Sequence, residues 1–366
     1  MTCETGAERT FCFIFPGFQN MHLTKDIGLI PYTMHKYYDC HSTIVCYNYG
    51  NYADLKYLEG VKIDFLGGSG NFDVDISNYL ASHSEIDVLF LCGLYGFNYS
   101  IIEKYREINP KGRIYLKLDA TLPWAERFQL DDEKLKFLKL CDVISVECKE
   151  LRTYLNNKWP VKVEYLPNGY WGFYEDDQLS YSKKENIILT VGRIGTWQKG
   201  TDTLLKAFGE AFQLIPGWRL ILVGGIEGSF VPSIQKILAE RPGLRDRVVF
   251  TGRIDDKNLL KAEYQKAKVF CLPSRADNVC NVLPEAAISG CYIIVSNVDG
   301  APDITSDGTM GDIFAIDNIP QLSEIMVRVC LDEEGLRTNF PKIRKHAFDN
   351  FNWVKICHQL NTCLGH

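Results

Sequence analysis

The chain has 366 residues, of which 46% are hydrophobic and 23% charged, and its formal net charge is −6. This balance is typical of a globular protein and excludes a disordered chain, while the length favours two domains. The acidic balance argues against broad electrostatic binding to nucleic acid, which needs a basic face, so we expect no nucleic-acid partner.

Thirteen cysteines stand out, but their number is odd and no C-x-x-C pair occurs among them. The first ten residues are polar and lack the charged-then-apolar pattern of a secretory signal. We therefore expect reduced, mostly buried thiols in a cytoplasmic protein. The longest apolar runs, such as residues 86–97, are too short to span a bilayer. Any membrane contact, such as one at the inner membrane face, would be peripheral.

Short apolar runs alternate with helical patterns along the whole chain. The first series of predicted strands covers residues 10–16, 42–49, 62–67, 87–93, 113–119 and 142–147. The second series covers residues 186–193, 218–225, 247–253, 268–274 and 291–296. Continuous apolar runs bounded by Gly, Pro or Asp are typical of parallel strands buried on both faces. Helical patterns fill the gaps, so each series predicts a doubly wound α/β sheet.

The two series predict two domains and a terminal helix. We place an N-terminal domain at residues 1–170, a C-terminal domain at 171–348 and the terminal helix at 349–366. The break falls in residues 171–185, which are polar, acidic and without periodicity. Ligands of open α/β sheets bind beyond the carboxyl ends of the strands, so the expected site is a cleft between the two domains.

Residues 190–208 carry two cations at the end of a predicted strand. Arg193 follows Gly192, and Lys199 leads through a loop into a helical pattern. Two cations at a strand's carboxyl end suit a diphosphate, because Arg binds oxygens bidentately and Lys supplies a compact charge. Thr201 and Asp202 are predicted caps of the next helix. Taken alone, a pair of solvated surface cations explains the pattern equally well.

Residues 274–290 carry two carboxylates on either side of a predicted helix start. Asp277 lies in a loop and Glu285 one turn into the helix, with Pro284 in its first turn. Such a start suits phosphate binding by free backbone N–H groups, here those of Cys280, Asn281 and Val282. Carboxylates are poor phosphate ligands, so the two acids should meet hydroxyls that flank the phosphates. The alternative is a helix whose early acids only complement its dipole.

Together the two segments resemble the donor domain of retaining GT-B glycosyltransferases of family 4, the group 1 glycosyl transferases. The family's Gly-Arg…Lys-Gly signature matches Gly192, Arg193, Lys199 and Gly200. Its Glu–seven residues–Glu motif matches the span from Asp277 to Glu285, although Asp replaces the first Glu. The resemblance is strong over residues 166–360 and weak before them.

The resemblance implies an α/β GT-B fold, in which two Rossmann-like doubly wound domains face an interdomain cleft. It implies a retaining, metal-independent hexosyltransferase without a cofactor. The donor would be a nucleotide diphosphate sugar, with a UDP-sugar favoured over a GDP-sugar. The acceptor would be the hydroxyl of a glycan or a lipid-linked sugar, in the synthesis of bacterial surface polysaccharide or another glycan.

The resemblance also implies roles for single residues. Arg193 and Lys199 would bind the diphosphate and stabilise its charge as it leaves, Asp277 would contact the donor sugar, and Glu285 would bind the ribose. Asp119 stands roughly where the family often has a His near the transferred sugar. The remaining expected donor contacts are Gly17, Arg253, Ile254, Cys280, Asn281 and Val282.

Several patterns leave alternatives open. Asp277 is one methylene shorter than the family's Glu, which bears on the donor sugar and on activity itself. A non-catalytic partner that stabilises an active glycosyltransferase is therefore a second hypothesis, and a nucleotide-sugar isomerase of GT-B-like fold is a third. Glu147 follows a predicted strand and either contacts the acceptor or has a structural role. The Asp-x-Asp of residues 71–77 is interpreted as a helix start and not as a metal site.

Overall fold

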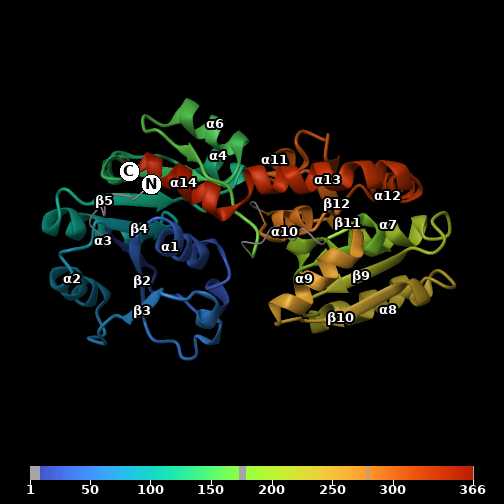
Figure 1. Ribbon diagram of the computed structural model, residues 1–366, viewed down its shortest axis with the longest axis horizontal. Coiled ribbons are helices and arrows are strands. Elements are labelled where there is room, and N and C mark those ends of the chain that lie inside the picture. The colour runs from blue at the N-terminus through green and yellow to red at the C-terminus, as the bar shows by residue number, and fades with distance from the viewer. Residues whose placement is uncertain (1–8, 173–178, 278–279, 366) are drawn as a thin grey trace, which may run out of the picture. The chain divides into compact units, whose positions relative to one another are not determined.

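The computed structural model describes residues 9–172, 179–277 and 280–365. They belong to two compact units (Figure 1). The first unit comprises Met1–Pro167 and Trp353–His366, and the second comprises Asn168–Asn352. The predicted domain boundaries lie at 170/171 and 348/349. Residues 173–178 of the predicted break lie outside the described residues.

The first unit contains a seven-stranded sheet in the order β3-β2-β1-β4-β5-β6-β7, and every pairing is parallel. Strands β4 and β6 are buried along their whole length, which explains their continuous apolar sequence. The strands are β1 (Arg9–Ile14), β2 (Cys40–Cys46), β3 (Lys62–Phe65), β4 (Val88–Cys92), β5 (Arg113–Lys117), β6 (Val143–Val146) and β7 (Glu164–Tyr165). The two-residue β7 was not predicted, because it is too short to form a pattern.

The helices of the first unit are α1 (Asp26–Tyr37), α2 (Phe72–Ser82), α3 (Gly96–Ile108), α4 (Leu122–Arg127), α5 (Asp132–Lys139), α6 (Lys149–Lys158) and α14 (Trp353–Cys363), with 3-10 turns η1 (Asn20–His22) and η2 (Ala53–Tyr57). Helix α14 packs on α1. Two hydrogen bonds fix it: the Tyr38 hydroxyl donates to the Val354 carbonyl at 2.6 Å, and Arg9 donates to Asn361 Oδ1 at 2.8 Å. The last helix of the chain is therefore part of the first unit.

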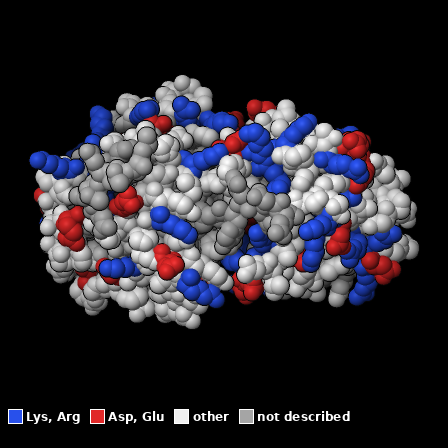
Figure 2. Space-filling view, viewed as in Figure 1, with Lys and Arg blue, Asp and Glu red and all other residues white. Residues whose placement is uncertain are grey.

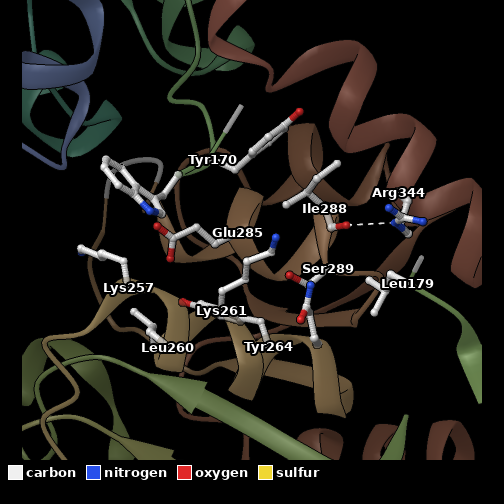
Figure 3. Close-up of a pocket in the computed structure, with 13 residues that line it drawn as sticks. Tyr170, Leu179, Lys257, Leu260, Lys261, Tyr264, Glu285, Ile288, Ser289 and Arg344 are labelled. Atoms are coloured by element: carbon white, nitrogen blue, oxygen red, sulfur yellow. Dashed lines mark hydrogen bonds between the residues drawn. The ribbon is translucent and has the colours of Figure 1, made fainter. Parts of the chain in front are cut away.

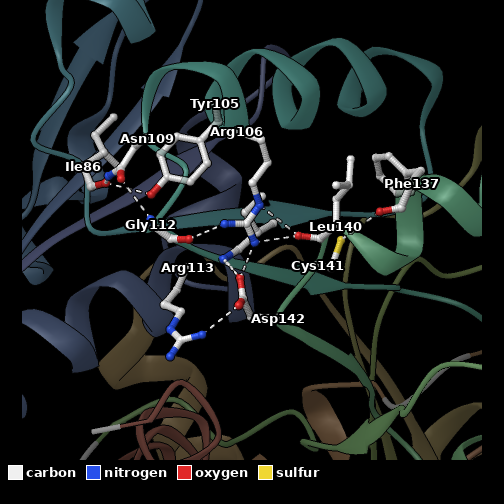
Figure 4. Close-up of polar contacts among 11 residues, drawn as sticks. Ile86, Tyr105, Arg106, Asn109, Gly112, Arg113, Phe137, Leu140, Cys141 and Asp142 are labelled. Carbon is white, nitrogen blue, oxygen red and sulfur yellow. Dashed lines mark hydrogen bonds and ion pairs between the residues drawn. The ribbon is translucent and has the colours of Figure 1, made fainter.

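A polar network fixes the amino ends of two neighbouring strands, β5 and β6 (Figure 4). Arg106 of α3 donates to the Leu140 carbonyl at 2.7 Å and to Asp142 Oδ2 at 2.5 Å. Arg113, the first residue of β5, donates to the other oxygen of Asp142 at 2.9 Å. Because Asp142 directly precedes β6, these bonds link α3 to β5 and β6 at the amino ends of the two strands.

The second unit contains a six-stranded parallel sheet in the order β10-β9-β8-β11-β12-β13. Its strands are β8 (Glu185–Val191), β9 (Arg219–Val223), β10 (Val248–Gly252), β11 (Ala267–Leu272), β12 (Tyr292–Ser296) and β13 (Gly311–Phe314). Its helices are α7 (Thr201–Ala211), α8 (Val231–Ala239), α9 (Lys257–Lys266), α10 (Val282–Ile288), α11 (Ala301–Thr305), α12 (Ile319–Leu331) and α13 (Glu333–Asn350), with 3-10 turns η3 (Tyr181–Lys183), η4 (Trp197–Lys199), η5 (Gly228–Phe230) and η6 (Arg245–Arg247).

Two hydrophobic clusters form the core of the second unit. One includes Leu204, Phe208 and Leu222, and the other includes Phe270 and Ile293. Both clusters contain residues of the sheet together with residues of the surrounding helices, as expected for a doubly wound unit. The two predicted α/β sheets are thus confirmed. In each sheet the strand order reverses beside the first strand of the series, where β1 lies next to β4 and β8 lies next to β11. In each unit this switch point is where ligands of such sheets bind.

The state of the cysteines and the distribution of surface charge can be compared with what the composition predicts. The cysteines among the described residues are all free, and most of them are buried. No helix among the described residues is long and apolar enough to cross a membrane. On the face in Figure 2, the Lys and Arg side chains of the described residues are interspersed with Asp and Glu.

Candidate functional site

Two loops of the second unit meet beyond the carboxyl ends of neighbouring strands. Strands β8 and β11 pair in parallel, so the loop after β8, residues 192–200, lies beside residues 273–277, which follow β11. The first segment carries Arg193 and Lys199, the second carries Asp277, and Cys280 follows it in the chain. The fold therefore brings together residues that are about 80 positions apart in the chain.

Lys199 and Asp277 form the centre of this arrangement. The Lys199 Nζ atom lies 2.5 Å from Asp277 Oδ2 and 3.3 Å from the Cys280 sulfur. Both side chains are largely buried, at 16% and 6% exposed. Burial alone would lower the pKa of Lys199, but the neighbouring Cys280 and Asp277 raise it overall. Lys199 therefore stays positively charged at neutral pH.

Neutral side chains extend the network outward. Ser274 Oγ donates to Asp277 Oδ2 at 2.8 Å, and Gln198 Nε2 lies 3.4 Å from Asp277 Oδ1. The other end of the Gln198 amide accepts a 2.6 Å bond from Arg193, whose side chain is exposed. Sequence reasoning missed Ser274 and Gln198, because neutral polar residues in a loop carry no specific signal. The result is one exposed and one buried cation in the same network.

Gly200 brings the backbones of the two loops into contact. Its φ of +57° lies in the left-handed region, and an added Cβ would lie 2.0 Å from the Pro273 carbonyl oxygen. Gly200 is also the N-cap of α7, so the prediction that Thr201 and Asp202 cap this helix is wrong. Both are already helical: the Thr201 hydroxyl accepts from the Gly195 N–H at 3.2 Å, and Asp202 binds Arg275.

Helix α10 follows the second segment in the chain. Its first residue is Val282 and its N-cap is Asn281, so Pro284 lies in the first turn as predicted. The N–H groups of a first turn have no partner inside their own helix. The predicted backbone donors Asn281 and Val282 thus lie at the helix start, directly after Cys280. Glu285 also belongs to this first turn, and it lines a separate pocket.

Glu285 lines a pocket between α9 and α10 (Figure 3). Lys257, Lys261 and Tyr264 line it from α9. The other lining residues are Tyr170, Trp171, Gly172, Leu179, Leu260, Gln265, Ile288, Ser289 and Arg344. Burial raises the pKa of the Glu285 carboxyl, and the charge of Lys257 partly opposes this rise. The pocket therefore combines a carboxylate with aromatic walls and cationic side chains.

The other predicted site residues do not join these networks. Arg253 follows β10 and forms an exposed pair with Asp255 at 2.6 Å, and Ile254 packs against a core cluster. Gly17 lies in a turn after β1, where an added Cβ would make only an ordinary contact with Phe15 at 3.7 Å. Asp119 follows β5 and is exposed, with a φ of +48°. Gly17 and Asp119 both belong to the first unit.

The first unit contains a buried charge cluster that the sequence did not reveal. Lys117 at the end of β5 is 1% exposed, lies 2.9 Å from Asp26 Oδ2 and pairs with Glu147, which follows β6. Glu147 is equally buried, and its Oε2 has no hydrogen-bond partner among the described residues. Burial raises the pKa of Glu147 to about 7, against the opposing charge of Lys117. The cluster lies at the carboxyl edge of the sheet.

Comparisons with known proteins point to one class of protein. Residues 185–332 match the model of the family Glycosyl transferases group 1. A D-inositol 3-phosphate glycosyltransferase of Segniliparus rotundus is 32% identical over 135 residues, which cover 37% of this chain and 30% of that protein. A phosphatidyl-myo-inositol mannosyltransferase of Mycobacterium leprae is 24% identical over 182 residues, which cover 49% of this chain and 46% of that protein. The matches thus span about a third to a half of these curated relatives.

Solved structures resemble the whole chain. The structure of Anabaena Alr3699/HepE in complex with UDP has a TM-score of 0.74 and 15% identity, and the match covers 98% of this chain and 99% of that one. Sucrose-phosphate synthase from Thermosynechococcus elongatus has a TM-score of 0.67 and 18% identity, with 97% and 98% covered. At such identities the likeness is one of fold. The chain therefore has the two-domain fold of the GT-B glycosyltransferases, and residues 185–332 of its second unit are similar to the group 1 glycosyl transferases.

Proposed function

We propose that the chain is a retaining hexosyltransferase of family 4 that moves a sugar from a nucleotide diphosphate sugar to an acceptor hydroxyl. The carrying observation is the Lys199–Asp277 pair, with Arg193 joined to it through Gln198. These residues lie inside the segment that matches the group 1 family. A UDP-sugar is the favoured donor and a GDP-sugar the second, and the UDP complexes of HepE support this order.

The network suits a leaving diphosphate. In the reaction the bond between the anomeric carbon and the diphosphate oxygen breaks, and a bond from the acceptor oxygen to that carbon forms. Negative charge develops on the diphosphate, where Lys199 and Arg193 stabilise it. The proton of the acceptor hydroxyl passes to the released phosphate. No metal or cofactor is needed in this scheme, because the two side chains supply the positive charge.

The carboxylates on either side have separate roles in the proposal. Asp277 pairs with Lys199 when no donor is bound, and it can turn to a sugar hydroxyl once the diphosphate takes that cation. Glu285 accepts hydrogen bonds from the ribose hydroxyls at the edge of its pocket. The N–H groups of Cys280, Asn281 and Val282 face the phosphates, and Arg253 with Ile254 meets the base.

The acceptor side is assigned to the first unit. Gly17 lets its backbone approach the diphosphate, and Asp119 acts near the transferred sugar. The proposed acceptor is a glycan or a lipid-linked sugar in bacterial surface polysaccharide synthesis, and the proposed location is the cytoplasm. Peripheral contact with the inner membrane face is part of the proposal, although two of the three apolar residues of α5, Phe137 and Leu138, are buried.

The release of nucleotide diphosphate tests the proposal. Purified protein is incubated with UDP-glucose, UDP-galactose, UDP-N-acetylglucosamine and GDP-mannose, with and without simple sugar acceptors. We expect slow release from one donor, and a loss of at least about a hundredfold in Lys199→Met, as for other removed charge-stabilising donors. The matched control is Lys206→Met, which removes an exposed cation from α7. This variant should release nucleotide diphosphate at the wild-type rate. No release from any donor would refute the proposal.

The second candidate is a non-catalytic partner that keeps the fold. The identity of residue 277 favours it, because this Asp is one methylene shorter than the Glu of the family's motif. A partner would bind a nucleotide diphosphate without releasing it from a sugar donor. It would also co-purify with an active glycosyltransferase, which the enzyme proposal does not require.

A further inference from the structure

Arg275 lies two residues before Asp277 and joins three segments of the second unit. Its side chain is 12% exposed. The guanidinium binds both oxygens of Asp317 at 2.8 Å and both oxygens of Asp202 at 2.9 and 2.8 Å. Asp202 lies in the first turn of α7, and Asp317 lies in the turn between β13 and α12. One buried cation thus holds two carboxylates that are far apart in the sequence.

The same residue also binds the loop that carries Lys199. Arg275 donates a bond from its guanidinium to the Trp197 carbonyl at 2.9 Å, and its backbone N–H donates to the Gln198 carbonyl at 2.7 Å. These carbonyls belong to the two residues directly before Lys199. The loops of Lys199 and Asp277 are therefore joined at two places: at an inner joint, where Lys199 and Gln198 contact Asp277, and at the Arg275 joint.

Neighbouring contacts make this second joint rigid. The Thr203 hydroxyl donates to Asp317 Oδ1 at 2.7 Å, so α7 and the Asp317 turn are also linked directly. The hydrogen bonds from Arg275 lower the pKa of Asp317, which stays charged at neutral pH. A planar guanidinium directs five donors along a fixed fork and so reaches two carboxylates and a carbonyl that lie in different directions, whereas the three donors of a Lys ammonium radiate from a single atom and do not reproduce this fork.

We propose that Arg275 is a positioning residue that sets the distance between Lys199 and the loop of Asp277, and thereby the fit of a donor diphosphate. The inference rests on the proposed function, because it assigns Lys199 to the diphosphate. When the diphosphate displaces Asp277 from Lys199, the inner joint opens. The Arg275 joint then keeps the two loops together, so that Lys199 stays where the phosphate is bound.

The test uses the full chain with Arg275→Lys and, as a second variant that keeps the arginine, Asp317→Asn. The matched control is Arg328→Lys, since Arg328 forms a 2.5 Å ion pair with Asp312 elsewhere in the same unit. Hydrogen exchange measured by mass spectrometry comes first and needs no ligand. We expect exchange in residues 195–200 to rise about tenfold in both test variants but not in the control, with β8 and β9 unchanged.

UDP and GDP titrations then separate a positioning role from a structural one. We expect Arg275→Lys to weaken binding of the preferred nucleotide diphosphate about tenfold, as for the loss of charge-assisted hydrogen bonds, and to leave the affinity for the free nucleoside unchanged. If Arg275 acts through Lys199, the loss should disappear in a Lys199→Met background, because the two effects are coupled. Arg328→Lys should bind as the wild type does.

The outcomes are distinguishable. Unchanged exchange, unchanged diphosphate affinity, or a loss that persists fully in Lys199→Met would each overturn the role of Arg275 and leave the proposed function intact. If the wild type binds neither UDP nor GDP, the proposed function fails first, and the positioning role falls with it. Faster exchange together with a Lys199-dependent loss of affinity supports the inference.

Discussion

The buried Lys117–Glu147 pair predicts that the first unit becomes less stable as pH rises from 5 to 8. Burial raises the pKa of Glu147 from its ordinary 4.5 to about 7 in the folded chain. Between these values the folded state binds more protons than the unfolded state, so the stabilisation is full below 4.5 and is lost as pH rises through 7. The difference between these two pKa values corresponds to about 3 kcal/mol of unfolding free energy. Lys117 does not titrate here, because the neighbouring carboxylates raise its pKa despite burial.

Urea unfolding at pH 5 and pH 8 measures this difference. Glu147→Gln removes the titrating group, and Glu103→Gln on the exposed face of α3 is the matched control. Between pH 5 and pH 8 we expect the wild type and Glu103→Gln to lose roughly 2–3 kcal/mol more unfolding free energy than Glu147→Gln loses. The same pH dependence in wild type and Glu147→Gln would refute the reasoning, because some other group would then have to titrate.

Three further predictions concern the second unit. Gly200→Ala should destabilise it by more than about 3 kcal/mol, because the added Cβ meets the Pro273 carbonyl oxygen. Gly217→Ala is also at positive φ but in open space, so it should cost about 1 kcal/mol. Thermal unfolding compares the two variants, and equal losses of stability would contradict the predicted clash with Pro273. Arg328→Ala breaks a pair whose Arg is 59% exposed, so urea unfolding should show a loss under about 1 kcal/mol. Burial raises the pKa of Cys271, so iodoacetamide should label Cys271 only after unfolding, and labelling of the native chain would be the contrary result.

The strands could be predicted because parallel strands buried on both faces need continuous apolar runs. Strand β13 was missed, since its four residues include Gly311 and Asp312 and do not form such a run. The cap of α7 was predicted wrongly for a local reason. Thr and Asp are frequent caps, but the left-handed backbone of Gly200 already begins the helix.

The candidate site could be predicted only as far as its charged residues. The strand pattern placed Lys199 and Asp277 at carboxyl ends of strands, but their direct contact depends on β8 and β11 being neighbours. Burial was harder still to predict. Lys117 follows three apolar residues, 114–116, and precedes Leu118, and this pattern does not distinguish a buried Lys from one at the surface. Its role follows from Asp26 and Glu147, which come from other elements.

A thermal-shift comparison tests most directly the claim that the Lys199 network binds a nucleotide diphosphate. Wild type, Arg193→Ala and Lys199→Met are each heated with UDP, GDP and ADP. At a concentration about a hundred times its dissociation constant, a ligand adds about 2.7 kcal/mol of stability. We predict such a stabilisation of the wild type by UDP, a smaller one in Arg193→Ala and the smallest in Lys199→Met. No stabilisation by any of the three, or an equal one in all three proteins, would contradict the account.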